Sequence, residues 1–274
     1  NSMEQRPVTI PATSRIPNRL AAATEADYDD YFRLQRSGSD LEEWTSQCLG
    51  LGSDLTADLS DSGLSQEARI AFMSGLMIMY RTTLERWLRA MPRNETAPDY
   101  ETNREPAADA MGKWKLGHQA FHVYLVTTIT LLDEARAHAY EWTPSRIATT
   151  LEDLTMMFEA ATASMIYASD FDKETYNGVI RPSMMPPETP PGFSGSLNAD
   201  HQNMKAAFQA LTTTLMDRFG ETCDRWPPVI EQRWRELKQA RAENHRHHIL
   251  ICRRFVGEQP SLLQIGRQMI KEAP

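Results

Sequence analysis

The chain has 274 residues, of which 41% are apolar, and a formal net charge of −8 at pH 7. A chain of this size suits one large domain or two small ones. An acidic chain without a basic tract argues against a nucleic-acid-binding protein and against a basic membrane-surface protein. No apolar run reaches the roughly 20 residues that a membrane helix needs, and no signal peptide is recognisable. With three scattered cysteines, the sequence predicts a cytoplasmic protein without a disulfide framework.

The N-terminal region is polar and contains scattered prolines and serines. The sequence predicts a polar arm over residues 1–40, in which Asn1–Ser2 resembles a tag remnant, and a single helical domain over residues 41–274. A short helix is expected over 41–51, followed by a loop rich in Ser, Asp and Gly over 54–65.

Hydrophobic periodicity predicts five long helices and no strands, so the expected fold class is all-α, a helical bundle. The helices are expected over about 66–91, 107–139, 144–169, 198–219 and 227–257, with a polar loop over 92–106. The first of them carries a stripe of apolar residues at helical spacing, which should face the core. The stripe contains Ile70, Met73, Met77, Tyr80, Leu84, Trp87 and Met91.

A long irregular stretch is expected over residues 176–195, which hold five prolines and three glycines. Proline inside a helix removes a hydrogen bond and clashes with the preceding turn, and it also interrupts a central strand. A structureless loop of this length inside a compact domain is usually functional. We therefore expect this Pro-rich loop to cover a binding site.

The predicted helix over 227–257 has an apolar stripe that polar residues interrupt. The stripe contains Ile230, Trp234, Leu237, Arg241, Asn244, His248, Ile251 and Phe255. A buried polar group without a partner costs about 1–3 kcal/mol, so the three polar residues in the middle predict a pocket. Histidine is also a common metal ligand, which makes His248 the candidate of most interest.

A second histidine, His118, lies on the inward face of the predicted helix over 107–139, between Trp114 and Phe121. A single histidine on an apolar stripe is more often a satisfied core residue, and this is our interpretation of His201. Cys252 follows His248 by four residues and shares its helix face, although a free cysteine is usually a small buried hydrophobe. These patterns alone leave both a functional site and ordinary core histidines open.

Two segments resemble motifs of tryptophan 2,3-dioxygenase. The segment from His118 to Phe121 resembles the distal-histidine motif, in which His-Gln is followed by an aromatic residue and a long apolar helix. The segment from His248 is similar to the proximal-histidine segment, in which an Arg and a Gly follow the iron-ligating histidine by six and nine residues. Arg254 and Gly257 match both offsets, but the residues after Gly257 depart from the family's Gly/Thr/Ser-rich turn.

The wider group is the histidine-ligated haem-dependent aromatic oxygenases. The chain resembles most the haem-dependent tyrosine and 3-methyltyrosine hydroxylases of natural-product biosynthesis, because the spacing of His248 and Cys252 is similar to a haem-attachment motif there. The resemblance implies a bundle that encloses haem, with His248 as the iron ligand. The haem would be b-type, or c-type through a single thioether to Cys252. Around this cofactor we expect Arg241, Asn244 and Arg254.

The same resemblance implies hydroxylation of the aromatic ring of L-tyrosine, or of a methylated tyrosine, to a catechol such as L-DOPA. The oxidant would be hydrogen peroxide, or O2 with a reductant, and the setting antibiotic biosynthesis. His118 would act as the catalytic acid or base, and Arg181, at the family's distance from His118, would bind the amino-acid carboxylate. Ser183, Tyr176 and Phe121 are further candidates for substrate contacts.

Assemblies of relatives imply a homo-oligomer, either a dimer or a tetramer. Three other interpretations stay open. The chain could be a tryptophan- or indole-cleaving haem dioxygenase, a non-haem metal enzyme that uses His118 and His122, or a non-catalytic helical interaction module.

Overall fold

The computed structural model describes residues 21–34, 36, 40–90, 109–257 and 259–272. This part of the chain is helical and contains no strand, so the predicted all-α fold is confirmed. None of its helices is both long enough and apolar enough to cross a membrane. The predicted polar loop over 92–106 lies outside the described residues.

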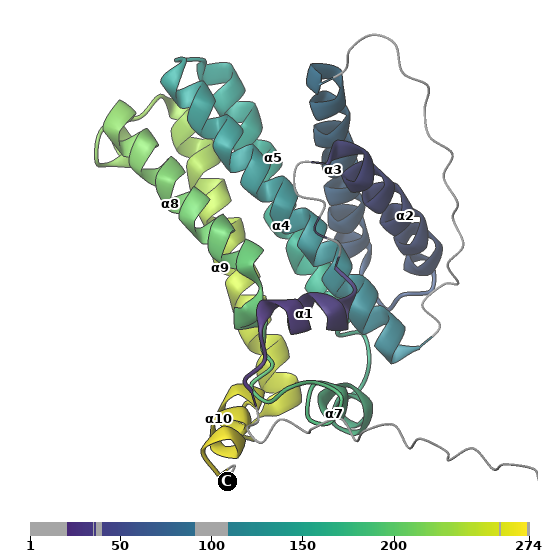
Figure 1. The fold of residues 1–274 in the computed structure, drawn as a ribbon. Helices are drawn as coiled ribbons and strands as arrows, with labels where there is room; N and C mark the ends of the chain where they lie inside the picture. Colours follow the sequence, from purple (N-terminus) through teal and green to yellow (C-terminus); the bar gives the residue numbers. More distant parts are fainter. Residues whose placement is uncertain (1–20, 35, 37–39, 91–108, 258, 273–274) are drawn as a thin grey trace, which may run out of the picture.

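The helices follow one another in chain order and are labelled in Figure 1. They are α1 (Glu25–Phe32), α2 (Leu41–Leu59), α3 (Gln66–Ala90), α4 (Ala110–Tyr140), α5 (Pro144–Ala168), α6 (Lys173–Thr175), α7 (Arg181–Ser183), α8 (Ala199–Phe219), α9 (Pro228–Val256) and α10 (Leu262–Glu272). A π-helical segment (Tyr176–Ile180) joins α6 to α7, and two short 3-10 turns (Gly195–Leu197 and Cys223–Arg225) precede α8 and α9.

Local sequence signals set the ends of the long helices. The Asp109 carboxylate accepts a hydrogen bond from the Gly112 amide at 2.7 Å and so caps the start of α4. Proline begins both α5, at Pro144, and α9, at Pro228, where the missing N–H costs nothing. Gly257 ends α9 with a φ of +58°, a conformation that other residues rarely adopt.

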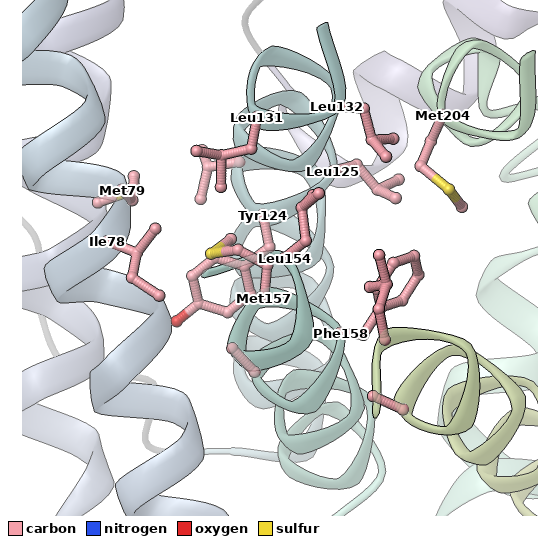
Figure 2. Packing of buried hydrophobic residues seen from close by; sticks show 14 of the residues in the cluster. Ile78, Met79, Tyr124, Leu125, Leu131, Leu132, Leu154, Met157, Phe158 and Met204 are labelled. Carbon is pink, nitrogen blue, oxygen red and sulfur yellow. The ribbon is translucent and has the colours of Figure 1, made fainter. Parts of the chain in front are cut away.

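Helices α4 and α5 form the middle of the bundle, with α8 and α9 on one side and α2 and α3 on the other (Figure 1). Figure 2 shows the core between these layers, where side chains from α3, α4, α5 and α8 meet. A Cβ added at Gly75 would lie 2.3 Å from the Cβ of Ala160, so glycine is what lets α3 approach α5. The shorter helices α1, α7 and α10 gather at one end of the bundle (Figure 1).

Helix α2 is longer than the sequence predicts. The helix expected to end near residue 51 continues to Leu59, and part of the expected loop over 54–65 is therefore helical. Leu51, Leu55 and Leu59 share one face and are each less than 7% exposed, so burial of this leucine row outweighs the turn-forming residues between them.

The prediction of which face of α3 is buried is wrong. Ile70, Met77 and Leu84 are 59%, 65% and 57% exposed, whereas Phe72 and Met79 on the opposite face are fully buried. Both faces of α3 are apolar, so helical periodicity could not tell which of them faces the core. Met91, the last residue of the predicted stripe, lies outside the described residues.

The predicted N-terminal arm is wrong for its last part, because α1 lies within it. Thr24 caps this helix through a reciprocal contact with Asp27, and the rings of Tyr28 and Phe32 are 4% and 1% exposed. Residues 1–20 lie outside the described part of the chain. Since α1 contributes buried aromatic rings, the domain predicted over 41–274 extends at least to α1.

The first half of the Pro-rich stretch is also helical, contrary to the prediction. The π-helical segment runs directly into α7, and Pro182 falls in the first turn of α7, where proline is tolerated. The stretch from Met184 to Ser194 has no regular helix, as expected. It is nevertheless packed, because Phe193 is 1% exposed and a Cβ on Gly266 of α10 would lie 2.1 Å from the Gly192 nitrogen.

Candidate functional site

A second cluster of buried residues lies at the end of the bundle near α1, separate from the main core. It joins α1, the segment after α5, the Pro-rich loop and the end of α9. Its buried members are Tyr28, Phe32, Leu34, Tyr176, Ile180, Met184, Phe193 and Phe255. The first half of α4, which carries His118, contacts this cluster through Trp114.

His118 has a defined ring orientation and protonation state. Its Nδ1 lies 2.7 Å from the carbonyl oxygen of Trp114, and because a carbonyl only accepts, Nδ1–H donates this bond. The ring of Phe32 stacks on the imidazole. Burial, with a smaller contribution from the charge of His248, lowers the pKa of His118 to about 4. At neutral pH the imidazole is therefore uncharged, with an unprotonated Nε2.

His248 and Cys252 lie one turn apart on α9, and neighbouring residues cover each of them only in part. The His248 Nε2 lies 3.6 Å from the Cys252 Sγ. Partial burial lowers the pKa of His248 and raises the pKa of Cys252, so the pair consists of a neutral imidazole and a thiol at neutral pH. A neutral imidazole next to a thiol is a donor set that suits one protein ligand and one covalent anchor for a haem.

His201 on α8 is a third histidine in this region, and sequence reasoning placed it in the core. It is half-buried, and burial followed by the charges of Lys205, His248, Arg241 and His245 lowers its pKa. His118 and His201, from α4 and α8, thus both lie within electrostatic range of His248 on α9. The sequence signal that could have placed His201 near the site was its position on an inward-facing apolar stripe, which it shares with His118.

His118 and His122, the pair of the non-haem metal interpretation, have different partners in the structure. His122 is 3% exposed, and its Nδ1 lies 3.0 Å from the Asp200 carboxylate on α8. Among the described residues there is no group of three or more His, Cys, Asp or Glu side chains that could hold a metal ion. His122 therefore belongs to the packing of α4 against α8.

Arg241 and Asn244, expected near the cofactor, contact neighbouring helices. The Arg241 guanidinium lies over the ring of Phe208 on α8, 4.1 Å from its centroid. The Asn244 side-chain amide donates to the Thr162 hydroxyl at 3.0 Å and to the Phe158 carbonyl at 3.4 Å, both on α5. These two polar members of the α9 stripe are satisfied by packing contacts, which leaves His248 as the stripe residue with an exposed side chain.

Arg254 ties α9 to the end of α5. Its guanidinium donates to the carbonyl oxygen of Ser169 at 2.8 Å and to that of Phe171. Carbonyl groups at a helix C-terminus lack intrahelical partners, so Arg254 satisfies the end of α5. The match of Arg254 to a family motif therefore coincides with a structural contact in this chain.

Arg181, the expected carboxylate-binding residue, is buried with 8% of its surface exposed. One terminal nitrogen donates to the Pro260 carbonyl oxygen at 2.6 Å. The other, NH1, is buried without a hydrogen-bond partner among the described residues. A buried guanidinium nitrogen without an acceptor is costly, and a carboxylate would satisfy it.

Ser183 and Tyr176, the further substrate candidates, lie in the same region as Arg181. The Ser183 hydroxyl donates to the Ile180 carbonyl oxygen at 2.7 Å, so the hydroxyl of Tyr31, 2.6 Å away, donates to Ser183. The Tyr176 ring stacks on Phe255 with centroids 4.5 Å apart. Phe121, by contrast, packs against the main core.

Helix α1 was missed as part of the site because its segment was expected to be an arm. A charged network holds it in place. Arg36 pairs with Asp29 of α1 and, at 2.8 Å, with Asp200 on α8. Asp200 also faces His122 on α4, and the neighbouring positive charges hold its pKa below the ordinary value despite burial. This network fixes Tyr31 and Phe32 over the start of α4.

Comparison with known proteins gives a consistent family. A family model described as SfmD 3-methyl-L-tyrosine peroxygenase matches residues 3–237. A 3-methyl-L-tyrosine peroxygenase of Streptomyces lavendulae is 31% identical over 189 residues, which is 65% of this chain and 48% of the relative. The chain thus spans about half the length of this relative. The matched residues of the family model include His118 and Arg181 but end before His248 and Cys252.

The fold agrees with this family. A solved structure titled as reduced SfmD, soaked with sodium hydrosulfite, superposes with a TM-score of 0.58 at 22% identity. The match covers 88% of this chain and 75% of that one. Since the family model covers most of the chain and the helical architecture matches, the chain belongs to the SfmD-type 3-methyl-L-tyrosine peroxygenase family.

Proposed function

We propose that the chain is a haem-dependent enzyme that hydroxylates the aromatic ring of tyrosine or of a methylated tyrosine. Membership of the peroxygenase family supports this proposal. The observation that carries it is the constellation of His248 and Cys252 on α9 within electrostatic range of the neutral, Nε2-unprotonated His118 on α4.

In this proposal His248 would hold the haem through its iron, and Cys252 would anchor the macrocycle through a thioether. The lowered pKa of His248 keeps its nitrogen lone pair available for a metal at neutral pH. The raised pKa of Cys252 keeps its proton on the sulfur at neutral pH, and formation of a thioether would add that sulfur and that proton across a vinyl double bond of the haem. When bound, the haem supplies the oxidising chemistry, which activates hydrogen peroxide, or O2 with a reductant, for oxygen transfer.

His118 is proposed as the acid-base residue. Because Nδ1–H is held by the Trp114 carbonyl, only Nε2 can take up a proton. With a pKa of about 4 the ring starts unprotonated at neutral pH, so its first action is to accept a proton from the peroxide or from the substrate phenol. The stacked Phe32 keeps water from one face of the ring and holds its orientation.

The substrate is proposed to bind where α7 and α1 meet. The buried NH1 of Arg181 offers a charged donor to the amino-acid carboxylate. The linked hydroxyls of Ser183 and Tyr31 offer a polar contact close to it, and the Tyr176 and Trp114 rings offer aromatic surface. These contacts suit a small aromatic amino acid. Phe121 packs against the main core and is not part of this proposed site.

By family resemblance we also propose a catechol product, such as L-DOPA or its methylated equivalent. We further propose that the enzyme acts in antibiotic biosynthesis in the cytoplasm and that it is a homo-oligomer.

Product analysis after incubation with peroxide and either L-tyrosine or 3-methyl-L-tyrosine tests the reaction. A catechol supports the proposal, whereas cleavage of the indole of tryptophan would favour the dioxygenase alternative.

The absorption spectrum of the haem-supplemented protein tests the cofactor. We expect a Soret band that His248→Ala abolishes or shifts and that His247→Ala leaves unchanged. His247 is the matched control, because its Nδ1 lies 3.0 Å from the Glu243 carbonyl of its own helix. Haem that stays with the wild type in acid-acetone but leaves Cys252→Ser indicates the thioether. A protein without a Soret band would refute the haem proposal.

A further inference from the structure

Helix α3 carries an apolar face that no other described residue covers. Its members lie along the whole helix and are Ile70 (59% exposed), Met73 (39%), Met77 (65%), Leu84 (57%) and Leu88 (71%). The opposite face, with Phe72, Leu76 and Met79, is at most 1% exposed and packs into the bundle. We call the five exposed side chains the outer face of α3. The proposed reaction uses none of them.

The size of the outer face is unusual for a surface that stays in water. From the exposed fractions, the five side chains present on the order of 500 Å² of apolar surface, the upper end of what a monomer shows. A stable dimer buries about 800 Å² on each partner. The outer face and the polar residues beside it, such as Gln66 and Arg81, can together supply an area of that order.

The two halves of the outer face differ in what they present to solvent. The N-terminal half borders a groove of about 520 Å³, lined by Gln66, Arg69, Ile70, Met73, Ser74, Met77, Ile78 and by Met156 of α5. The C-terminal half carries Leu84 and Leu88, two of the most exposed apolar side chains of the helix. Helix α3 therefore borders a groove at its N-terminal half and presents exposed leucine side chains at its C-terminal half.

The spacing of these residues is self-complementary. Met77 lies seven residues from both Ile70 and Leu84, which is about 10 Å of helix in each direction. If two α3 helices pack antiparallel across a two-fold axis at Met77, Leu84 of each copy lies opposite Ile70 of the other. Leu88 then lies opposite Gln66, over the groove. Both grooves are filled at once, and the helix dipoles oppose favourably.

We propose that the outer face of α3 is the interface of a homodimer, in which two α3 helices pair antiparallel about Met77. The occupant is a second copy of this chain, because a two-fold arrangement fills both grooves with side chains that the same face supplies. This proposal does not depend on the haem chemistry, and its test requires no bound cofactor.

Light scattering after size-exclusion chromatography tests the proposal. We expect the wild type at twice its 31.2 kDa chain mass. Met77→Arg places two like charges together at the axis and should raise the dimer dissociation constant by about 100-fold or more. Val229→Arg is the matched control, since Val229 is 48% exposed on α9 and should leave the dimer intact. Equal melting temperatures, measured by circular dichroism, would confirm that both variants fold.

A monomeric wild type would overturn the proposal, and so would a Met77→Arg variant that remains dimeric. The outer face of α3 would then be exposed to solvent, covered by another segment of the chain, or bound by another protein. A tetramer that Met77→Arg reduces to dimers would support α3 as one of two interfaces.

Disulfide trapping tests the register. Because Met77 lies at the axis, Met77→Cys should cross-link to its own copy under mild oxidation. Ile70→Cys alone should not, but it should cross-link when mixed with Leu84→Cys. The wild type treated in parallel reports any cross-link through Cys223 or Cys252, the native cysteines that are not buried. Efficient self-cross-linking of both Ile70→Cys and Met77→Cys, with no cross-link between Ile70→Cys and Leu84→Cys, would show a parallel pairing and overturn the antiparallel register.

Discussion

The ring of Phe32 lies flat on the imidazole of His118, with centroids 4.0 Å apart and planes inclined by 11°. The two residues are far apart in sequence, and Phe32 belongs to α1, which a charged network holds against α4 and α8. The stack removes water from one face of the imidazole, which disfavours the protonated ring. Helix α1 is thus a wall of the candidate site.

Replacing Phe32 by Leu should raise the pKa of His118 from about 4 toward its ordinary 6.5, because water gains access to the imidazole. Phe193→Leu is the matched control. Phe193 is equally buried and packs against Phe32, with centroids 6.0 Å apart, but has no ring contact with His118. Histidine titration by NMR, assigned with a His118→Gln sample, measures the shift. A similar pKa change in both variants would contradict a specific role for the stack.

Asp200→Asn should destabilise the protein by about 3 kcal/mol, because it leaves Arg36 and the buried His122 without their carboxylate. Neighbouring positive charges lower the folded-state pKa of Asp200, so its contribution is present above the unfolded pKa and is lost as the pH falls through the folded pKa. Hydrogen exchange should rise in α1 first. The exposed Asp217→Asn on the same helix should change neither quantity. Unchanged exchange in α1 would argue that the network does not hold it.

Arg181→Lys should raise KM for the amino-acid substrate by about 10- to 100-fold and change kcat only a few-fold, since a point charge replaces a planar fork. A phenol that lacks the carboxylate should react equally with both proteins, because it does not use this contact. The comparison uses steady-state kinetics of catechol formation. Equal losses for both substrates would instead indicate that Arg181 acts through its hydrogen bond to the Pro260 carbonyl.

The long helices could be predicted because their signals are local. Proline at the starts of α5 and α9, and glycine at the end of α9, act within one turn of the chain. The buried side of α3 could not be predicted, because both of its faces are apolar and the choice depends on which face fits α4 and α5. Gly75 decides it, since only glycine permits the close approach to Ala160.

The candidate site was predicted in part. His118, His248 and Arg181 were named from stripe positions and motif spacing, and the structure brings the two histidines within electrostatic range. The predicted site lacked α1, because a short polar helix shows no periodic signal. Burial of Phe32 and Tyr31 depends on contacts made by residues 80 and 87 positions away. The roles of Arg241 and Asn244 could not be predicted either, because a polar residue on a stripe can as easily bond a neighbouring helix.

The protonation of His118 should also appear in the pH dependence of stability. Its pKa is about 4 when folded and near 6.5 when unfolded. Between these values the unfolded chain binds the extra proton, so stability falls as the pH is lowered through this window. At pH 5 the loss from this residue amounts to about 2 kcal/mol relative to pH 7.5.

Urea unfolding of the wild type and of His118→Gln at these two pH values isolates this contribution. The other titrating groups, including His201 and His248, are present in both proteins and largely cancel in the comparison. The wild type should lose about 2 kcal/mol more than the variant between pH 7.5 and pH 5. Equal losses would mean that His118 takes up its proton as readily in the folded protein as in the unfolded chain. His118 would then be protonated in mildly acidic solution, and the inference that burial keeps it a proton acceptor there would be wrong.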